Sequence, residues 1–217
     1  DARSAEDLMR KADMALYRAK SDGRGTWRFY DPDMEGRIKA RRQLEIDLGG
    51  AVARGQLELV YQPIVSLAAR RVEGCEALLR WRHPERGMVS PAEFIPVAEE
   101  TGLICGIGGW ALAAACRAAA SWPDGLFVSV NLSVAQFSGP DLACIAGKAL
   151  DDSGLHASRL ELEVTESLLL GDDPATYQLL HRLRTLGVPA ALDDFGTGYS
   201  SLSHLRRFPF DKIKIDQ

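Results

Sequence analysis

Short segments of alternating apolar and polar residues recur along the chain, separated by segments with helical periodicity. The alternating segments predict strands at residues 57–64, 72–81, 127–133, 159–165, 188–194 and 211–216. The helical periodicity predicts helices at residues 35–54, 91–99, 108–121, 140–152, 174–186 and 199–207. Because strands and helices alternate, the pattern favours parallel strands joined by crossover helices.

The predicted strands are apolar on one face only. In strand 159–165, Leu160 and Leu162 share one face, whereas Glu161 and Glu163 share the other. Strands of an open doubly wound sheet are covered by helices on both faces and should be apolar on both. A closed barrel explains the alternation, because its aliphatic faces meet the outer helices while its polar faces converge inside. An antiparallel sheet with one solvated face also alternates but needs no intervening helices, so we predict the α/β class and a TIM-like (β/α) barrel with its site at the C-terminal ends of the strands.

Two adjacent carboxylates, Asp193 and Asp194, end the predicted strand 188–194. Aspartate is a poor strand former, and two aspartates side by side repel each other unless a cation offsets the charge. A strand end followed by a helix cap is the simpler alternative. The alternation directs Asp193 inward, in line with Glu163 and Asn131, and the glycine turn that follows can swing Asp194 towards the mouth of the barrel.

The inward positions predict a ring of oxygen ligands with Asp194 beside it; its members are Glu76, Asn131, Glu163 and Asp193. A set rich in carboxylates suits Mg²⁺ or Mn²⁺ better than Zn²⁺. Such a cation would also make the two adjacent aspartates tolerable.

Composition and charge are those of an ordinary soluble globular protein, with 46% hydrophobic and 26% charged residues. The formal charge of −4 offers no electrostatic case for nucleic-acid binding. The four cysteines show no C-x-x-C spacing and nothing resembles a signal peptide, so we expect a reduced, cytoplasmic setting, with any membrane anchor upstream. The uncharged stretch 101–116 is shorter than the ~20 residues that a spanning helix needs, so we expect a buried loop and helix there and no membrane segment.

The first thirty residues differ from the rest of the chain. A helical face that includes Leu8, Ala12 and Leu16 is followed by "TWRFY", a candidate short strand. One helix and one strand bury too little to form a core. We therefore predict that residues 1–34 are the tail of an upstream domain with a linker, and that residues 35–217 form the main domain.

Several motifs occur in order over residues 35–217. They are "YQPI" (61–64), "EALLRWRHP" (76–84), "SPAEFIPVAEETGLI" (90–104), "NLS" (131–133), "ELEVTES" (161–167), "DDFGTGYSSL" (193–202) and "KIKID" (212–216). Together they resemble the EAL family of cyclic-di-GMP phosphodiesterases. The segment "RKADMALYRAKSDGRG" resembles the closing helix of a GGDEF (diguanylate cyclase) domain, whose signature loop this chain lacks.

The resemblance implies metal-dependent hydrolysis of one phosphodiester bond in cyclic di-GMP, which gives linear pGpG. It makes the predicted oxygen ring the metal ligands, and it places Asp194 at a second metal site beside the substrate. A catalytic role is implied for three residues: Lys214 at the attacking water, Asp216 beside the metals, and Glu166 as the anchor of the loop after the aspartates. Arg80 would contact a substrate phosphate, and Gln62 would lie at the nucleotide site.

The residues themselves leave simpler readings open. Lys214 could pair with Glu161 or Asp216 inside the barrel. Glu166 could simply lie where a strand ends and a loop begins. Arg80 could form only an ion pair with an acidic residue of its own strand. For the whole domain, the alternatives are a catalytically inactive cyclic-di-GMP receptor of the same fold and a metal-free barrel glycosidase.

The sequence ends at Gln217, just after the sixth predicted strand, whereas the family pattern continues with two more strands. Eight strands close such a barrel, so the barrel predicted here is incomplete. We expect the longer parent protein to be active and residues 1–217 alone to be poorly active or misfolded. The expected partners are cyclic di-GMP, an upstream GGDEF-type domain and a second copy of the chain in a homodimer.

Overall fold

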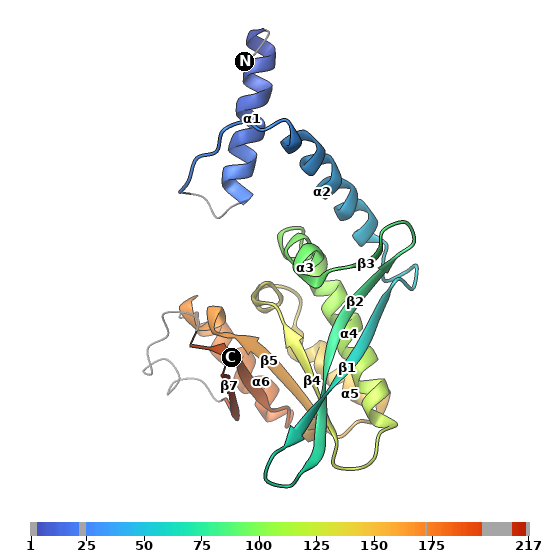
Figure 1. Cartoon of the computed structure of the whole chain (residues 1–217). Coiled ribbons are helices and arrows are strands. Elements are labelled where there is room, and N and C mark those ends of the chain that lie inside the picture. Colours follow the sequence, from blue (N-terminus) through green and yellow to red (C-terminus); the bar gives the residue numbers. More distant parts are fainter. Residues whose placement is uncertain (1–3, 22–24, 172, 197–209, 216–217) are drawn as a thin grey trace. The chain divides into compact units, whose positions relative to one another are not determined.

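The structure is a computed structural model of the chain, and it describes residues 4–21, 25–171, 173–196 and 210–215 (Figure 1). The chain divides into two compact units, residues 1–48 and residues 49–217. The assignment of residues 1–34 to an upstream domain stays a prediction.

The first unit consists of two helices, α1 (Ala5–Ser21) and α2 (Asp33–Gly49). An ion pair of 3.1 Å between Arg10 of α1 and Glu35 of α2 links them. The strand predicted at "TWRFY" is wrong, because the described residues 25–31 form no strand. Trp27 and Phe29 are 70% and 79% exposed, so the apolar residues that suggested a strand have no sheet to join.

The second unit is built on a single sheet. Its strands are β1 (Leu57–Ser66), β2 (Arg71–His83), β3 (Gly87–Val89), β4 (Phe127–Leu132), β5 (Leu160–Thr165), β6 (Ala190–Phe195) and β7 (Lys212–Ile215). The order across the sheet is β1-β2-β4-β5-β6-β7, with β3 on β2. The structure confirms the positions of all six predicted strands.

The direction of the first strand differs from the prediction. β1 pairs antiparallel to β2, while β2, β4, β5, β6 and β7 are parallel to one another. The connection between β1 and β2 has only four residues, 67–70, and a parallel pair needs a crossover of a dozen or more. The short strand β3 was not predicted. The fold is α/β with a mostly parallel sheet, consistent with a TIM-like barrel, and this sheet does not close within the described residues.

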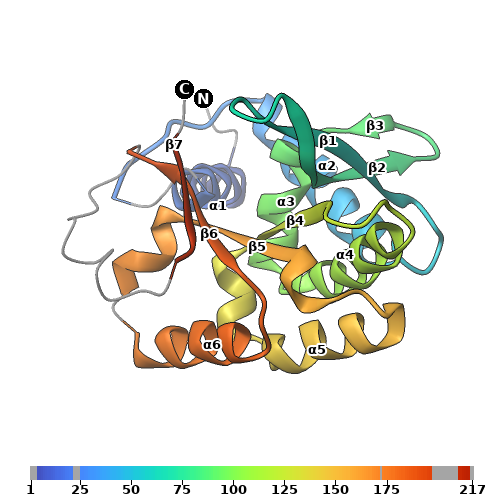
Figure 2. The same cartoon turned by 90° about the horizontal axis from the view of Figure 1, so that it is seen from below.

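The parallel strands are joined by helices. These are α3 (Pro91–Glu100), α4 (Leu103–Ala120), α5 (Leu142–Ser153) and α6 (Pro174–Thr185), with short 3-10 helices η1 (Val134–Ser138), η2 (Ala157–Arg159) and η3 (Glu166–Gly171). Helices α4, α5 and α6 lie along one face of the sheet (Figure 2). The predicted helix 199–207 lies outside the described residues.

Helix α4 begins five residues earlier than predicted, because the glycines near its start do not end the helix. A Cβ on Gly108 would lie 2.7 Å from Cδ of the buried Gln136 side chain, so only glycine lets η1 approach α4 this closely. Within the described residues, α4 is the one helix long and apolar enough to cross a membrane. However, Leu112, Ala115 and Cys116 of this helix are fully buried in the protein core. This is the position expected of a core helix.

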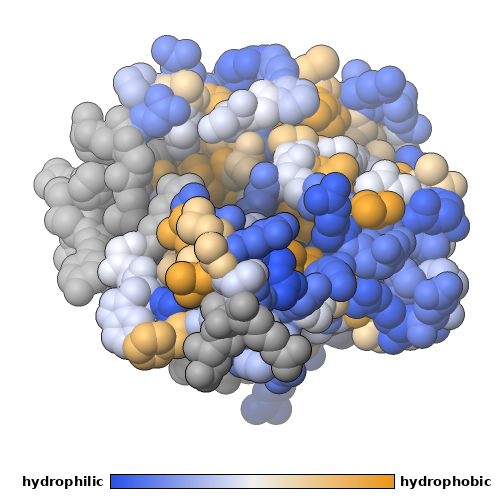
Figure 3. Space-filling model, turned by 90° about the horizontal axis from the view of Figure 1, so that it is seen from above, coloured by the Kyte–Doolittle hydropathy of each residue, from blue (hydrophilic) through white to orange (hydrophobic). Residues whose placement is uncertain are grey.

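The core lies between these helices and the apolar face of strands β4, β5 and β6. Val128, Leu160 and Leu192 have no exposed surface. The last strand is different, since Ile213 and Ile215 are 47% and 78% exposed among the described residues. On the face drawn in Figure 3, hydrophilic residues predominate, with smaller hydrophobic areas between them.

Candidate metal and substrate site

An acidic centre lies at the carboxyl ends of the parallel strands. It combines Glu76 of β2, Glu163 of β5 and Asp193 of β6. Each of the three offers a carboxylate oxygen, and these oxygens lie within 4.8 Å of one another. The alternation of the strands brings them together, as the sequence predicted, because inward-facing residues of parallel strands end at one edge.

Lys214 of β7 supplies a positive charge at this centre. Its Nζ atom lies 2.7 Å from Oε2 of Glu163, 3.0 Å from Oδ2 of Asp193 and 3.6 Å from Oε2 of Glu76. The reading in which Lys214 pairs with Glu161 is therefore wrong. Lys212 forms that pair instead, at 2.7 Å. Asp216 lies outside the described residues, so its role stays a prediction.

Asn131 completes the set of four predicted metal ligands. It is paired in register with Glu163 at the end of β4, and its Nδ2 donates to Oε1 of Glu76 at 2.7 Å. Because the amide nitrogen is used in this bond, the amide oxygen remains as the atom that can bind a cation. The sequence prediction thus brought together four residues that the structure also places side by side.

Burial and charge oppose each other at Glu163, which is only 1% exposed. Burial raises the pKa of its carboxyl group, and the hydrogen bonds from Lys214 and Ser129 only partly counter this. Burial lowers the pKa of Lys214, but its hydrogen bonds to Glu163 and Asp193 outweigh that effect and raise it above the ordinary value. Lys214 is therefore a permanent cation at neutral pH.

The donor set fits a hard divalent cation. Three carboxylates and one amide oxygen are the ligands that Mg²⁺ and Mn²⁺ accept, and the described residues of the centre include no thiolate or imidazole. Three converging carboxylates also repel one another, and among the described residues Lys214 brings one positive charge to the group. A divalent ion would satisfy the charge that remains.

Asp194 lies next to the centre but is not one of its three carboxylates. β6 bulges at this point, because the register with β7 shifts between Leu192 and Phe195. Asp194 adopts φ of 55°, in the left-handed region, and its backbone N–H donates to Oδ1 of Asp193 at 3.0 Å. The bulge breaks the alternation, and the side chain of Asp194 is exposed. Its place at a second metal site stays a prediction.

Glu166 contacts the segment that follows β6. Its carboxylate is 5% exposed, and Oε2 accepts a hydrogen bond of 3.1 Å from the backbone N–H of Gly196. Gly196 has φ of 105°, which favours glycine, so the turn and its anchor fit each other. This contact is compatible with the anchoring role predicted for Glu166.

The two predicted substrate residues lie on the antiparallel pair of strands. Gln62 of β1 is exposed and is paired in register with Glu76. The guanidinium of Arg80 donates to the carbonyl of Leu79 at 2.9 Å, and Arg71 forms the ion pair with Glu73 at 4.0 Å. Arg80 is only partly buried, so its guanidinium can turn towards a ligand.

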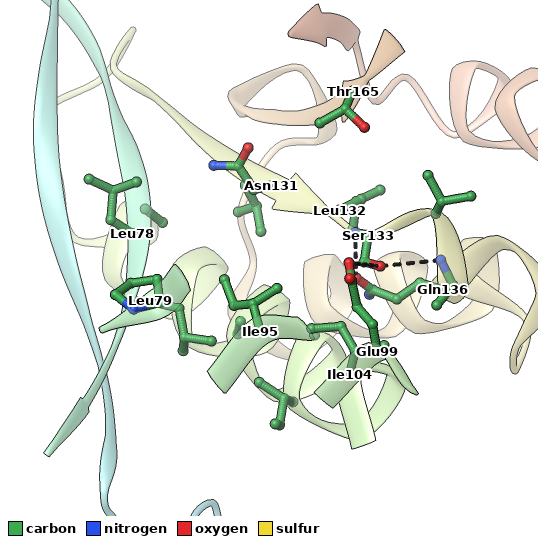
Figure 4. A pocket seen from close by; sticks show the side chains of 18 of the residues that line it. Leu78, Leu79, Ile95, Glu99, Ile104, Asn131, Leu132, Ser133, Gln136 and Thr165 are labelled. Atoms are coloured by element: carbon green, nitrogen blue, oxygen red, sulfur yellow. Dashed lines mark hydrogen bonds between the residues drawn. The ribbon is translucent and has the colours of Figure 1, made fainter. Parts of the chain in front are cut away.

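A cavity of about 550 Å³ lies beside the acidic centre, between β2, β4, α3, α4 and η1 (Figure 4). Its walls are mostly aliphatic and include Leu78, Ile95 and Ile104, while Arg80 and Asn131 line it with polar groups. At its far side, Glu99, Ser133 and Gln136 are joined by hydrogen bonds: the Ser133 hydroxyl donates to Glu99 at 2.6 Å, and Gln136 accepts from the Ser133 backbone at 3.0 Å. The cavity has the size of a small-molecule site, and Asn131 belongs both to its lining and to the predicted metal ligands.

Sequence reasoning gave no role to the polar residues beneath the centre. Ser129 is fully buried on β4, and its hydroxyl contacts Glu163. Glu161 and Lys212 form their own pair nearby. Their inward positions were visible in the alternation, but which lysine meets which glutamate depends on the tilt of strands that are far apart in the sequence.

The fold and the site define an α/β domain with an acidic centre at the carboxyl edge of a parallel sheet. The model of the EAL domain family matches residues 45–217, and the chain belongs to this family. It is 52% identical over its whole length to an uncharacterized signaling protein of Caulobacter vibrioides, of which it covers 27%. It is 43% identical, again over its whole length, to the bifunctional diguanylate cyclase/cyclic di-GMP phosphodiesterase MucR of Pseudomonas aeruginosa, of which it covers 32%.

A solved structure of the MucR phosphodiesterase in complex with c-di-GMP has a similar fold. It aligns with 80% of this chain, which covers 72% of that structure, at a TM-score of 0.76 and 46% identity. The chain spans about a quarter to a third of the length of the full-length curated relatives it matches.

Proposed function

We propose that this domain hydrolyses one phosphodiester bond of cyclic di-GMP to give linear pGpG, with Mg²⁺ or Mn²⁺, in bacterial second-messenger signalling. The convergence of Glu76, Glu163 and Asp193 around Lys214 carries the proposal. The name of MucR, which includes a cyclic di-GMP phosphodiesterase, and its complex with c-di-GMP support the choice of substrate.

In this proposal, Glu76, Asn131, Glu163 and Asp193 hold the cation. A bound divalent ion would offset the negative charge of the phosphodiester and activate water at neutral pH. Lys214 adds a fixed ammonium beside the same carboxylates, where it orients the attacking water and faces the charge that grows on the phosphate. The oxygen of water forms a new bond to phosphorus and gives up one proton, the bond to the ribose 3′ oxygen breaks, and that oxygen takes up one proton, so that one water is consumed.

The cavity beside the centre accounts for binding of the nucleotide. Its aliphatic walls suit the faces of a guanine base, and Arg80 lines the cavity, where its guanidinium can bind a phosphate. Gln62, which is paired in register with Glu76, is assigned to the nucleotide site. Glu166 fixes the start of the loop through Gly196, which keeps the end of β6 in place when the site is loaded.

Outside the domain, we propose that a GGDEF-type domain precedes residue 35 in the whole protein. The name of MucR joins both activities in one chain, which supports this arrangement. A homodimer is proposed on the resemblance alone, and a cytoplasmic location is proposed on the cysteines, which show no C-x-x-C spacing.

The test compares two glutamates of the same strand. The purified whole protein is incubated with cyclic di-GMP and either Mg²⁺ or Mn²⁺, and pGpG is measured by anion-exchange chromatography. Glu76→Gln is expected to abolish pGpG formation, because it removes a ligand charge from the centre. Glu73→Gln, which changes an exposed ion pair near the start of β2, three residues before Glu76, is expected to keep the native rate. Excess EDTA is expected to stop the reaction.

Two other outcomes would overturn the proposal. Calorimetric binding of cyclic di-GMP without pGpG formation in either ion would identify a receptor of the same fold. Hydrolysis that survives EDTA would show that the carboxylates work without metal, as in glycosidases.

A further inference from the structure

Beneath the acidic centre lies a second layer of polar residues that the proposed chemistry does not use. It consists of Ser129 of β4, Glu161 of β5 and Lys212 of β7. Ser129 is fully buried and Glu161 is 6% exposed. Buried polar groups are costly unless they are paired, so such a layer needs a reason.

The distances show which residues of this layer form pairs. Nζ of Lys212 lies 2.7 Å from Oε2 and 2.9 Å from Oε1 of Glu161, so the lysine binds both oxygens of that carboxylate. The same ammonium lies 4.5 Å from the centre of the Phe127 ring, which further fixes its position. Glu161 is therefore neutralised by its own cation.

The hydroxyl of Ser129 has one proton and two carboxylates within reach. Its Oγ atom is 2.6 Å from Oε1 of Glu163 and 3.3 Å from Oε1 of Glu161. Because Lys212 already satisfies Glu161, the shorter bond to Glu163 takes the proton. A charge-assisted hydrogen bond of this length fixes the acceptor strongly.

Glu163 is consequently held from both sides, with Oε1 bound by Ser129 from below and Oε2 directed to the centre that Lys214 shares. The register explains how Lys212 can reach Glu161 across β6. The β6 residue paired with Lys212 is Ala191, a small side chain with no exposed surface that leaves room for the lysine.

We infer that Ser129 is a positioning residue for the cation site, and this inference rests on the proposed function. Because Lys212 pairs with Glu161, the Ser129 hydroxyl donates its hydrogen bond to Glu163. A partner that orients a metal ligand typically changes metal affinity by about 10- to 100-fold when it is removed. The bond to Ser129 selects the rotamer in which Oε2 of Glu163 faces the other two carboxylates.

The experiment measures cation affinity directly, without substrate. Free Mn²⁺ is titrated against the whole protein and followed by electron paramagnetic resonance, and thermal unfolding in EDTA is recorded for every variant. Ser129→Ala is expected to weaken Mn²⁺ binding by about 10- to 100-fold. Ser129→Thr, which keeps the hydroxyl, is expected to restore the native affinity. Ser153→Ala removes a hydroxyl that binds helix carbonyls of α5 and is expected to bind Mn²⁺ as the native protein does.

The outcomes separate this inference from the proposed function. Native Mn²⁺ affinity in Ser129→Ala, with or without a lower Tm, overturns the positioning role while the proposed function stands. Failure of the native protein to bind Mn²⁺ overturns both. If Ser129→Ala does not fold, Ser129→Cys keeps the volume with a weaker donor, and the same loss of affinity is expected there.

Discussion

The ammonium of Lys214 and the carboxylate of Glu163 are 2.7 Å apart, although β6 separates the strands that carry them. Asp193 of β6 shares the same ammonium at 3.0 Å, so one lysine holds carboxylates from two neighbouring strands. Replacing Lys214 therefore removes a charge from the point where the sheet gathers its acids.

Lys214→Met is expected to lower kcat for pGpG formation by about 10²- to 10³-fold, the usual cost of removing one group that stabilises the charge of the transition state. Methionine keeps much of the length and loses the charge and the donors. Lys148→Met, on the exposed surface of α5, is the matched control and should keep the native kcat. Equal kcat values for both variants would remove Lys214 from the reaction.

Much of the site could be predicted, because a period of two assigns each strand residue to a face. That argument placed Glu76, Asn131, Glu163 and Asp193 together before any contact was known. It could not place Asp194, since a bulge interrupts the period at that residue.

The fold shows the same division between local pattern and contacts over distance. Strand positions follow from local periodicity, but strand direction does not, so the antiparallel β1 was missed. The start of α4 was missed because glycines lower the helix propensity of residues 102–109, although Gly108 packs against Gln136 within the helix. Ser129 could be assigned to a face but not to a partner, since its contact depends on how β4 lies against β5.

Arg159 closes the end of α4 onto the start of β4, and its loss should destabilise the second unit. Its guanidinium donates to the carbonyls of Leu126 and Ala119, both at 2.8 Å. Arg159→Met leaves these carbonyls without a charged donor and should lower the free energy of unfolding by about 2–3 kcal/mol in a urea titration. Arg82→Met breaks an exposed ion pair with Glu58 and should cost less than ~1 kcal/mol. Similar losses in both variants would contradict a special role for Arg159.

Two glycines of α4 should respond to alanine in opposite directions. A Cβ on Gly106 meets nothing within 4 Å, so Gly106→Ala should raise the free energy of unfolding by up to about 1 kcal/mol through helix propensity. A Cβ on Gly108 would press on the Gln136 side chain, which binds the backbone of Ser133. Overpacking costs about 1–3 kcal/mol, so we expect a net loss of stability for Gly108→Ala. Urea unfolding of both variants checks this, and a gain in both would show that Gln136 moves aside freely.

Asp141 links the start of α5 to α6 and should make stability depend on pH. Its carboxylate accepts from Arg182 at 2.6 Å and from the backbone N–H of Cys144 at 3.2 Å, and these two bonds, the arginine first, hold its pKa below the ordinary value. A carboxyl with a lowered folded-state pKa stabilises the protein above its unfolded pKa, and that contribution is lost as the pH falls through the folded pKa.

Asp141→Asn keeps a capping oxygen but loses the charge, so its Tm should lie below the native Tm at neutral pH. The gap should close as the pH falls through the range in which the native carboxyl takes up its proton. Asp151→Asn, the control, removes the same charge from the other end of α5. Its Tm difference from the native protein is not expected to follow that of Asp141→Asn. Thermal unfolding of the three proteins across the acidic range gives the comparison. A gap between native and Asp141→Asn proteins that stays constant with pH would mean that the bond to Arg182 contributes nothing through its charge.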